Sequence, residues 1–164
     1  MHRESREALS SWYEQYKDEL KAVADMGSYD INGSVKEVIP YVVGFDICQG
    51  DNVDIVINNY VIAPEHLGVY DGVTALNSIQ YCDNPSMFVW NLRRLLRVGG
   101  RCLLTSCGPD CKQRHTPSPG AKDCIRFSPE QLRILFQSRG FSKIEIQRLC
   151  DRPNDDIILR AISI

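Results

Sequence analysis

The stretch AVADMGSYDINGS, residues 22–34, decides the fold class of this chain. Its apolar start predicts a short buried strand, and Gly27 follows with a residue that permits a tight turn. The polar turn after Gly27 lacks the spacing G-x-G-x-x-G with which a glycine-rich loop holds a pyrophosphate. A strand with this turn indicates an α/β protein and argues against a dinucleotide site.

Asp46 ends the next apolar run, YVVGFDI, about twenty residues after Gly27. A carboxylate at that spacing can accept hydrogen bonds from two ribose hydroxyls. The runs NVDIVI and YDGVTALNS predict two further strands, which end at Asn58 and at Asn77–Ser78. Because the carboxyl ends of parallel strands meet at one edge of a sheet, we expect these polar residues to line a nucleoside site.

The remaining segments complete an α/β pattern. Apolar residues recur at spacings of three and four through residues 1–21, which predicts an N-terminal helix. Asn84 and Ser128, each followed by a proline, predict the starts of two more helices, the first running to Gly99. RCLLTSC predicts a fifth strand, and FSKIEIQRL and DDIILRAISI predict an antiparallel pair. The chain thus predicts one domain, residues 1–164, with α/β layers around a mostly parallel sheet.

Two segments that connect the predicted strands and helices lead to further predictions. SVKEVIP has room for about two helical turns before Pro40 stops them. Residues 107–127 are rich in Pro and Gly and too long for a plain connection, so they predict a lid loop beside the site.

Composition limits the class of protein. No run of about 18 apolar residues is present, and the N-terminus is charged where a signal peptide is apolar, so we expect a soluble cytoplasmic protein without a membrane partner. The seven cysteines favour reduced buried thiols over a disulfide framework.

The charge of the chain is unevenly distributed. Residues 1–82 contain 5 Lys and Arg against 13 Asp and Glu, and residues 83–164 contain 14 Lys and Arg against 8 Asp and Glu. Two explanations of this asymmetry stay open. The oppositely charged halves attract each other within one domain, or basic side chains line one side of the site. No tract is basic enough for a nucleic-acid surface.

The spacing of cysteine and histidine raises the question of a metal. Cys107, Cys111 and His115 form C-x3-C-x3-H, and Cys124 follows in the same segment. This spacing is not the C-x2-C of common zinc sites, and Pro109 interrupts it. We therefore expect no metal ion.

The motifs quoted above also resemble a known family. D-x-G-S-x-D-x-N-G-S at residues 25–34, and LLRVGG before RCLLTS, are similar to motifs of small class I S-adenosylmethionine-dependent methyltransferases. The resemblance runs from Ala22 to the C-terminus. It implies a Rossmann-like three-layer α/β fold, in which a mostly parallel seven-stranded sheet has an antiparallel C-terminal strand. It also implies S-adenosyl-L-methionine as the cofactor.

The resemblance implies a role for each matching residue. The first motif would cradle the methionine part of the cofactor, and the acid that ends the second strand would bind ribose. The ends of the third and fourth strands would lie beside adenine and the transferred methyl group. The implied cofactor-binding residues are Asp25, Gly27, Ser28, Tyr29, Asp30, Asp46, Ile47, Ile57, Asn58, Asn77 and Ser78. The family usually has another glycine close behind the first, whereas the next glycine here is Gly33.

Methyl transfer from a sulfonium depends mainly on positioning and on excluding water, so a catalytic base is optional. His115 in the lid and His66 are the candidate bases, because imidazole titrates near neutral pH; both residues also suit solvated loops. The basic side chains of the lid could recognise a carboxylate or phosphate of the acceptor. They are Lys112, Arg114, Lys122 and Arg126. A solvated loop accounts for them equally well.

The sequence leaves two main functions open. The first is methyl transfer to a small-molecule acceptor, since NSIQYC after the fourth strand lacks the Pro-Pro-aromatic pattern of nucleic-acid amino-methyltransferases. The second is a catalytically silent methyltransferase-like partner protein. The missing glycines argue against a nicotinamide-dependent reductase. A short chain without a cap domain could complete its cleft with a second copy, which favours a homodimer.

Overall fold

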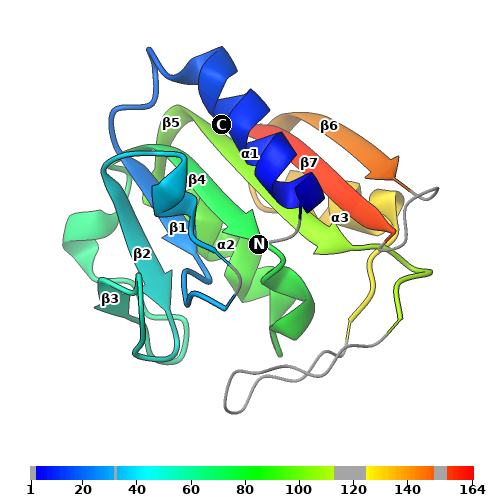
Figure 1. Cartoon of the computed structure of the whole chain (residues 1–164), viewed down its shortest axis with the longest axis horizontal. Coiled ribbons are helices and arrows are strands. Elements are labelled where there is room, and N and C mark those ends of the chain that lie inside the picture. The colour runs from blue at the N-terminus through cyan, green and yellow to red at the C-terminus, as the bar shows by residue number, and fades with distance from the viewer. Residues whose placement is uncertain (1–2, 32, 113–124, 150–154) are drawn as a thin grey trace.

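Seven strands form the central sheet of the molecule (Figure 1). The structure is a computed structural model that describes residues 3–31, 33–112, 125–149 and 155–164. The strands are β1 (Val23–Met26), β2 (Val42–Asp46), β3 (Ile55–Val56), β4 (Tyr70–Leu76), β5 (Leu96–Cys107), β6 (Phe141–Leu149) and β7 (Asp156–Ser163). The α-helices are α1 (Arg3–Tyr16), α2 (Pro85–Leu95) and α3 (Pro129–Ser138). Single turns of 3-10 helix are η1 (Val35–Glu37), η2 (Pro64–His66) and η3 (Ile79–Tyr81).

The sheet has the strand order β3-β2-β1-β4-β5-β7-β6. The pairs from β3 through β5 are parallel, and β7 is antiparallel to both β5 and β6. The predicted mostly parallel sheet with a reversed last strand is therefore confirmed. Strand order reverses between β1 and β4, and open α/β sheets bind ligands beyond the carboxyl ends of the strands at this point.

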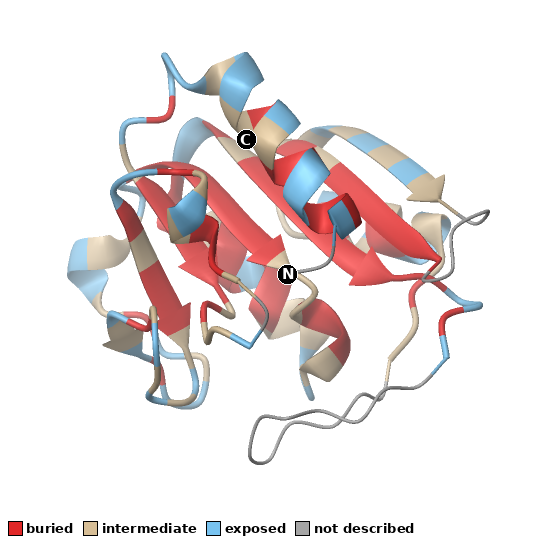
Figure 2. Ribbon diagram, in the orientation of Figure 1, coloured by how far each residue is buried: buried red, intermediate tan, exposed pale blue. Residues whose placement is uncertain are grey.

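Helices cover both faces of the sheet, which confirms the three layers (Figure 1). On one face, α2 and α3 bury Phe88, Leu92 and Phe136 against the sheet. On the other face, α1 buries Leu9 and Trp12. Figure 2 shows that the central strands are buried almost throughout, whereas β6 alternates between exposed and half-buried residues. None of the described helices has the length and apolarity to span a membrane.

The two predicted helix starts are confirmed. Asn84 caps α2, because its side chain accepts a hydrogen bond from the N–H of Met87 at 3.1 Å. Ser128 caps α3 and forms a capping box with Gln131. In both cases a proline occupies the first helical turn, where its missing N–H costs no hydrogen bond.

The expectation that α2 runs to Gly99 is wrong. Strand β5 already begins at Leu96, which pairs with Tyr70 of β4. Arg97 then forms an ion pair with Asp71, with 2.9 Å between Nε and Oδ1. Pairing with β4 therefore replaces the last predicted turn of helix.

Two other elements are shorter than the sequence predicts. The connection after β1 forms one turn, η1, instead of two, although Ser34 and Glu37 give it a complete capping box. The third strand is limited to the two residues of β3, and Asp54 before it contacts Gly44 of β2. The carboxylate of Asp54 accepts a hydrogen bond from the N–H of Gly44 at 2.7 Å. It also forms an ion pair with Lys36 at 2.7 Å. The backbone N–H of Asp54 also donates to the carbonyl oxygen of Gly44 at 2.9 Å, so both the backbone and the side chain of Asp54 tie it to β2.

Candidate functional site

The carboxyl ends of β1 and β4 lie in contact. Gly27, directly after β1, has a φ of 86°. A Cβ atom built on Gly27 would lie 2.2 Å from Oγ of Ser78, just beyond β4. Glycine is therefore required here by both the backbone conformation and the close approach. The glycine turn and the end of the fourth strand thus meet at the reversal of strand order.

Asp46 ends β2 with a carboxylate that backbone groups hold in place. Its Oδ2 accepts the N–H of Tyr29 at 3.1 Å, and its Oδ1 accepts the N–H of Cys48 at 3.0 Å. A carboxylate has about four acceptor positions, so two of them are left for a ligand. The next residue, Ile47, is an exposed apolar side chain beside this fixed charge.

Asp30 ties the turn after β1 to the loop after β2. Its Oδ1 accepts the N–H of Gly33 at 2.7 Å, and its Oδ2 accepts Nδ2 of Asn52 at 3.0 Å. The ring of Tyr29 packs against Gly50, where an added Cβ would lie 2.1 Å from a ring carbon. The two loops therefore form one connected unit around Asp46.

Asp25 is the buried acid of this edge, with 5% of its surface exposed. Oγ1 of Thr74 donates a hydrogen bond to its Oδ1 at 2.7 Å. Burial raises the pKa of Asp25 to about 7, and the nearby charge of Asp46 acts in the same direction, whereas the Thr74 hydrogen bond opposes it. Asp25 therefore exchanges a proton near neutral pH.

Asn77 links this edge to α1. Its backbone is left-handed, with a φ of 53°, and its Nδ2 donates to Oγ of Ser5 at 2.8 Å. Ser5 also shares a hydrogen bond of 3.0 Å with Oγ1 of Thr105 in β5. Sequence reasoning missed Ser5. A signal was present, because Ser5 lies four and seven residues before Leu9 and Trp12, on the core-facing side of α1.

Two buried polar atoms at this edge have no hydrogen-bond partner among the residues that the structure describes. They are Oγ of Ser28 and Oδ1 of Asn77. Buried polar atoms normally find a partner, so unpaired ones mark a place where a ligand or water can supply it.

The third strand brings one predicted residue to Asp46. Ile57 is buried, and its N–H donates to the carbonyl oxygen of Asp46 at 2.8 Å. Asn58, which follows, is exposed. Asn59 and Tyr60 then have positive φ values of 49° and 59°. The chain turns away from the sheet at this point in a conformation that few non-glycine residues adopt.

His66, a candidate catalytic base, lies in η2 among aromatic side chains. Its Nδ1 lies 3.0 Å from the hydroxyl of Tyr70, and its ring contacts Tyr70 and Phe45. Tyr70 begins β4, whereas Asn77 and Ser78 follow the end of the same strand. Aromatic residues of β2 and β4 therefore hold His66 in place, and its role as a base stays a prediction.

The other basic candidates belong to the predicted lid. Arg126 donates to the carbonyl oxygens of Cys111, Lys112 and Ile125 at 3.0, 3.1 and 3.0 Å. Arg126 thereby joins the two ends of the lid segment to each other. The side chain of Lys112 is exposed. His115, Arg114 and Lys122 lie outside the described residues.

Two cysteines of the metal motif considered above lie within the described residues. Cys107 and Cys111 are both buried. Within the described ranges, no group of three His, Cys, Asp or Glu side chains is arranged to hold a metal ion. His115 and Cys124, the other members of the considered set, lie outside those ranges.

No protein-family model and no curated protein matches the chain. Solved structures do match. The N1-methyltransferase of Burkholderia thailandensis, solved with 1,6-didemethyltoxoflavin and S-adenosylhomocysteine, has a TM-score of 0.70 at 15% identity, over 97% of this chain and 78% of that chain. A Thermotoga maritima methyltransferase, described as a possible histamine N-methyltransferase, has a TM-score of 0.68 at 16% identity, over 98% and 91%. Phosphoethanolamine N-methyltransferase 2 of Haemonchus contortus has a TM-score of 0.71 at 13% identity, over 96% and 53%. The chain has the class I methyltransferase fold.

Within this class I methyltransferase fold, several of the predicted site residues lie together at one edge of the sheet. Asp25, Gly27, Asp46, Asn77 and Ser78 lie at the carboxyl edge of neighbouring strands β1, β2 and β4. The fold thus gathers polar groups that are far apart in sequence, with α1 of the same chain closing one side.

Proposed function

We propose that this chain is an S-adenosylmethionine-dependent methyltransferase. The observation that supports it most is the carboxylate of Asp46, which the N–H groups of Tyr29 and Cys48 hold at the end of β2, the strand next to β1. A carboxylate fixed in this way is suited to accept hydrogen bonds from the two hydroxyls of a ribose. The cofactor, when bound, would supply a methyl group on a sulfonium.

The polar atoms of the edge fit such a cofactor. Oγ of Ser28 and Oδ1 of Asn77 are unpaired acceptors, which suit the ammonium group of a methionine moiety. Asp25, with its pKa raised by burial, would contribute negative charge above about pH 7. Exposed Ile47 next to Asp46 offers an apolar surface for a planar base. The backbone turn at Gly27 leaves room for close approach because it carries no Cβ.

The proposed acceptor is a small molecule. The similar structures include proteins solved with 1,6-didemethyltoxoflavin and with phosphomonomethylethanolamine, both small compounds. For this chain we propose that the acceptor enters beside Asn77 and the lid, with Lys112, Arg114 and Lys122 as candidates for recognising an acidic group. His115 is the proposed base if one is used. A cytoplasmic location and a homodimer belong to the same proposal.

Calorimetry with S-adenosylhomocysteine tests the cofactor site. We expect saturable binding to the wild type and about 10-fold to 100-fold weaker binding to Asp46→Asn, which corresponds to about 1.5–3 kcal/mol for hydrogen bonds to a charged group. Asp51→Asn is the matched control, because it removes an exposed carboxylate five residues away. Its affinity should stay within twofold of the wild type.

Two results would contradict the proposal. One is the absence of binding heat for both S-adenosylmethionine and S-adenosylhomocysteine with folded wild-type protein. The other is equal affinity of Asp46→Asn and the wild type. Thermal melting of each variant shows whether the turn around Tyr29 survives the substitution.

The second candidate function is a catalytically silent partner protein of the same fold. It predicts cofactor binding without methyl transfer to any acceptor tried. Incubation with labelled S-adenosylmethionine and small amine, hydroxyl and carboxylate acceptors distinguishes the two functions, since only the enzyme releases labelled product.

A further inference from the structure

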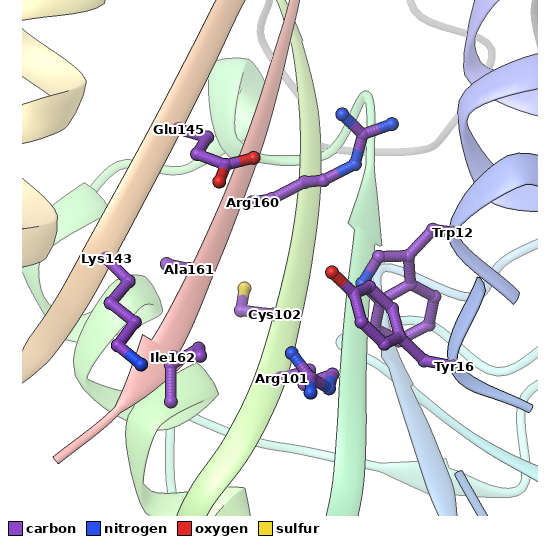
Figure 3. A pocket seen from close by; sticks show the side chains of 9 residues that line it. All are labelled: Trp12, Tyr16, Arg101, Cys102, Lys143, Glu145, Arg160, Ala161 and Ile162. Carbon is purple, nitrogen blue, oxygen red and sulfur yellow. The ribbon is translucent and has the colours of Figure 1, made fainter. Parts of the chain in front are cut away.

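A groove lies between α1 and β6, on the face of the sheet that α1 covers (Figure 3). Its volume is about 270 Å³. Trp12 and Tyr16 of α1 form one wall, and Lys143 and Glu145 of β6 form the other. Between these walls lie Arg101, Cys102, Arg160, Ala161 and Ile162 of β5 and β7. The groove exists because α1 packs over the middle of the sheet and leaves the same face of β7 and β6 open (Figure 1).

Arg101 has its charge compensated within the protein. Its guanidinium donates to the carboxylate of Glu19 at 2.8 and 3.0 Å. It also lies over the ring of Tyr16, 3.8 Å from the ring centroid. Arg101 and Tyr16 therefore form a fixed side of the groove and leave little charge for a ligand.

Arg160 is different, because its guanidinium has no acceptor in the described protein. Its Nε is buried and without a hydrogen-bond partner. It stands opposite Glu145 in the β6–β7 ladder, yet the described part of the chain contains no ion pair between them. A buried N–H without an acceptor costs free energy, so the guanidinium of Arg160 is not fully satisfied within the described residues.

Lys143 adds a second cation from the opposite wall. The β6–β7 register shifts between Ser142 and Glu145, and Lys143 has a left-handed backbone with a φ of 47°. Bulges of this kind re-aim side chains, and here both Lys143 and Glu145 line the groove. The groove therefore has one positive charge in excess, because Arg160 and Lys143 are both positive and only Glu145 is negative.

We propose that this groove binds a small organic monocarboxylate. The planar guanidinium of Arg160 suits two-point contact with a carboxylate, and Lys143, at the other end of the groove, adds positive charge to it (Figure 3). Tyr16 and Ile162 provide the apolar surface for the body of the ligand. Glu145 disfavours a second negative charge on the ligand. The volume is close to the lower limit of small-ligand pockets, about 300 Å³.

This site is separate from the proposed cofactor site. Trp12 and Tyr16 lie in the C-terminal half of α1, whereas Ser5, which contacts Asn77, lies in its first turns. The seven-residue step from Ser5 to Trp12 corresponds to about 10 Å along a helix. Carboxylate binding in the groove can therefore be tested independently of methyl transfer.

A fluorescence titration with benzoate tests the proposal. Trp90→Phe leaves Trp12, at the wall of the groove, as the only tryptophan of the chain. In this background we expect a saturable change with a millimolar dissociation constant. Benzamide, a neutral molecule of the same shape, should give no saturable change over the same range.

Variants in the same background locate the binding. Arg160→Gln should weaken benzoate binding at least tenfold, and Lys143→Gln should weaken it about threefold. Lys17→Gln is the control, because it removes an exposed charge next to Tyr16 that does not line the groove. Its affinity should remain within a factor of 1.5.

Several outcomes would overturn the proposal: no saturable response to benzoate, equal responses to benzoate and benzamide, or unchanged affinity in Arg160→Gln. If Arg160→Gln fails to fold, Lys143→Gln decides by itself, because Lys143 is exposed. Tighter binding of phenyl phosphate than of benzoate would overturn the assignment to a monocarboxylate.

Discussion

Gly27 combines two local constraints of the candidate site, one on its backbone and one on the space beside it. Its φ of 86° already favours glycine, and Ser78 occupies the space where a Cβ would project. Gly68 offers a matched comparison, because its φ is 71° and nothing lies within 4 Å of an added Cβ. The two positions separate the cost of backbone strain from the cost of steric overlap.

We therefore expect Gly27→Ala to destabilise the protein by about 3 kcal/mol and Gly68→Ala by about 1 kcal/mol. Urea unfolding followed by circular dichroism gives both values. Equal losses in the two variants would mean that the contact between Gly27 and Ser78 can relax without cost.

At the scale of elements, α1 is part of the candidate site as well as of the core. Ser5 is 1% exposed and bridges Asn77 beyond β4 and Thr105 of β5. Removing its hydroxyl leaves the amide of Asn77 without this acceptor inside the protein. The helix that covers the sheet thereby also orients a residue of the carboxyl edge.

Ser5→Ala should lower the free energy of unfolding by about 1–2 kcal/mol, the cost of an unsatisfied buried group. Ser11→Ala is the control on the exposed side of α1 and should change it by less than about 0.5 kcal/mol. Thermal and urea unfolding check both values. Equal stability of Ser5→Ala and Ser11→Ala would contradict the hydrogen-bonded link between α1 and the sheet.

The whole molecule should become less stable as the pH rises, because of Asp25. Its pKa is about 7 in the folded protein, above its ordinary value of 3.8, as a result of burial. Between these values the folded state holds a proton that the unfolded state has released, so the free energy of unfolding falls with rising pH. The fall begins near pH 4, is complete above about pH 7, and amounts to at most about 4 kcal/mol.

Urea unfolding from pH 5 to pH 8 tests this expectation. The wild type should lose stability over this range, and Asp25→Asn should remove most of the loss. Asp51→Asn, which replaces an exposed acid, should follow the wild-type curve. Parallel curves for the wild type and Asp25→Asn would show that Asp25 stays ionised in the folded protein.

Much of the architecture followed from local patterns. Proline after Asn84 and Ser128 marked two helix starts correctly, because caps act within one turn. The end of α2 was wrong, since the pairing of Leu96 with Tyr70 depends on a strand distant in sequence. For the same reason the sequence could not place His66, whose position depends on packing against Phe45 and Tyr70.

The sequence by itself determined the order of strands and helices, the glycine after β1 and the acid at the end of β2, since hydrophobic period and turn chemistry are local properties. Tertiary structure decided which polar groups share an edge: Asp46 is fixed by the N–H of Tyr29, and Asn77 by Ser5, seventy-two positions away. It also opened the groove between α1 and β6. Such contacts join residues that no sequence period relates, so they exist only once the sheet has brought them together.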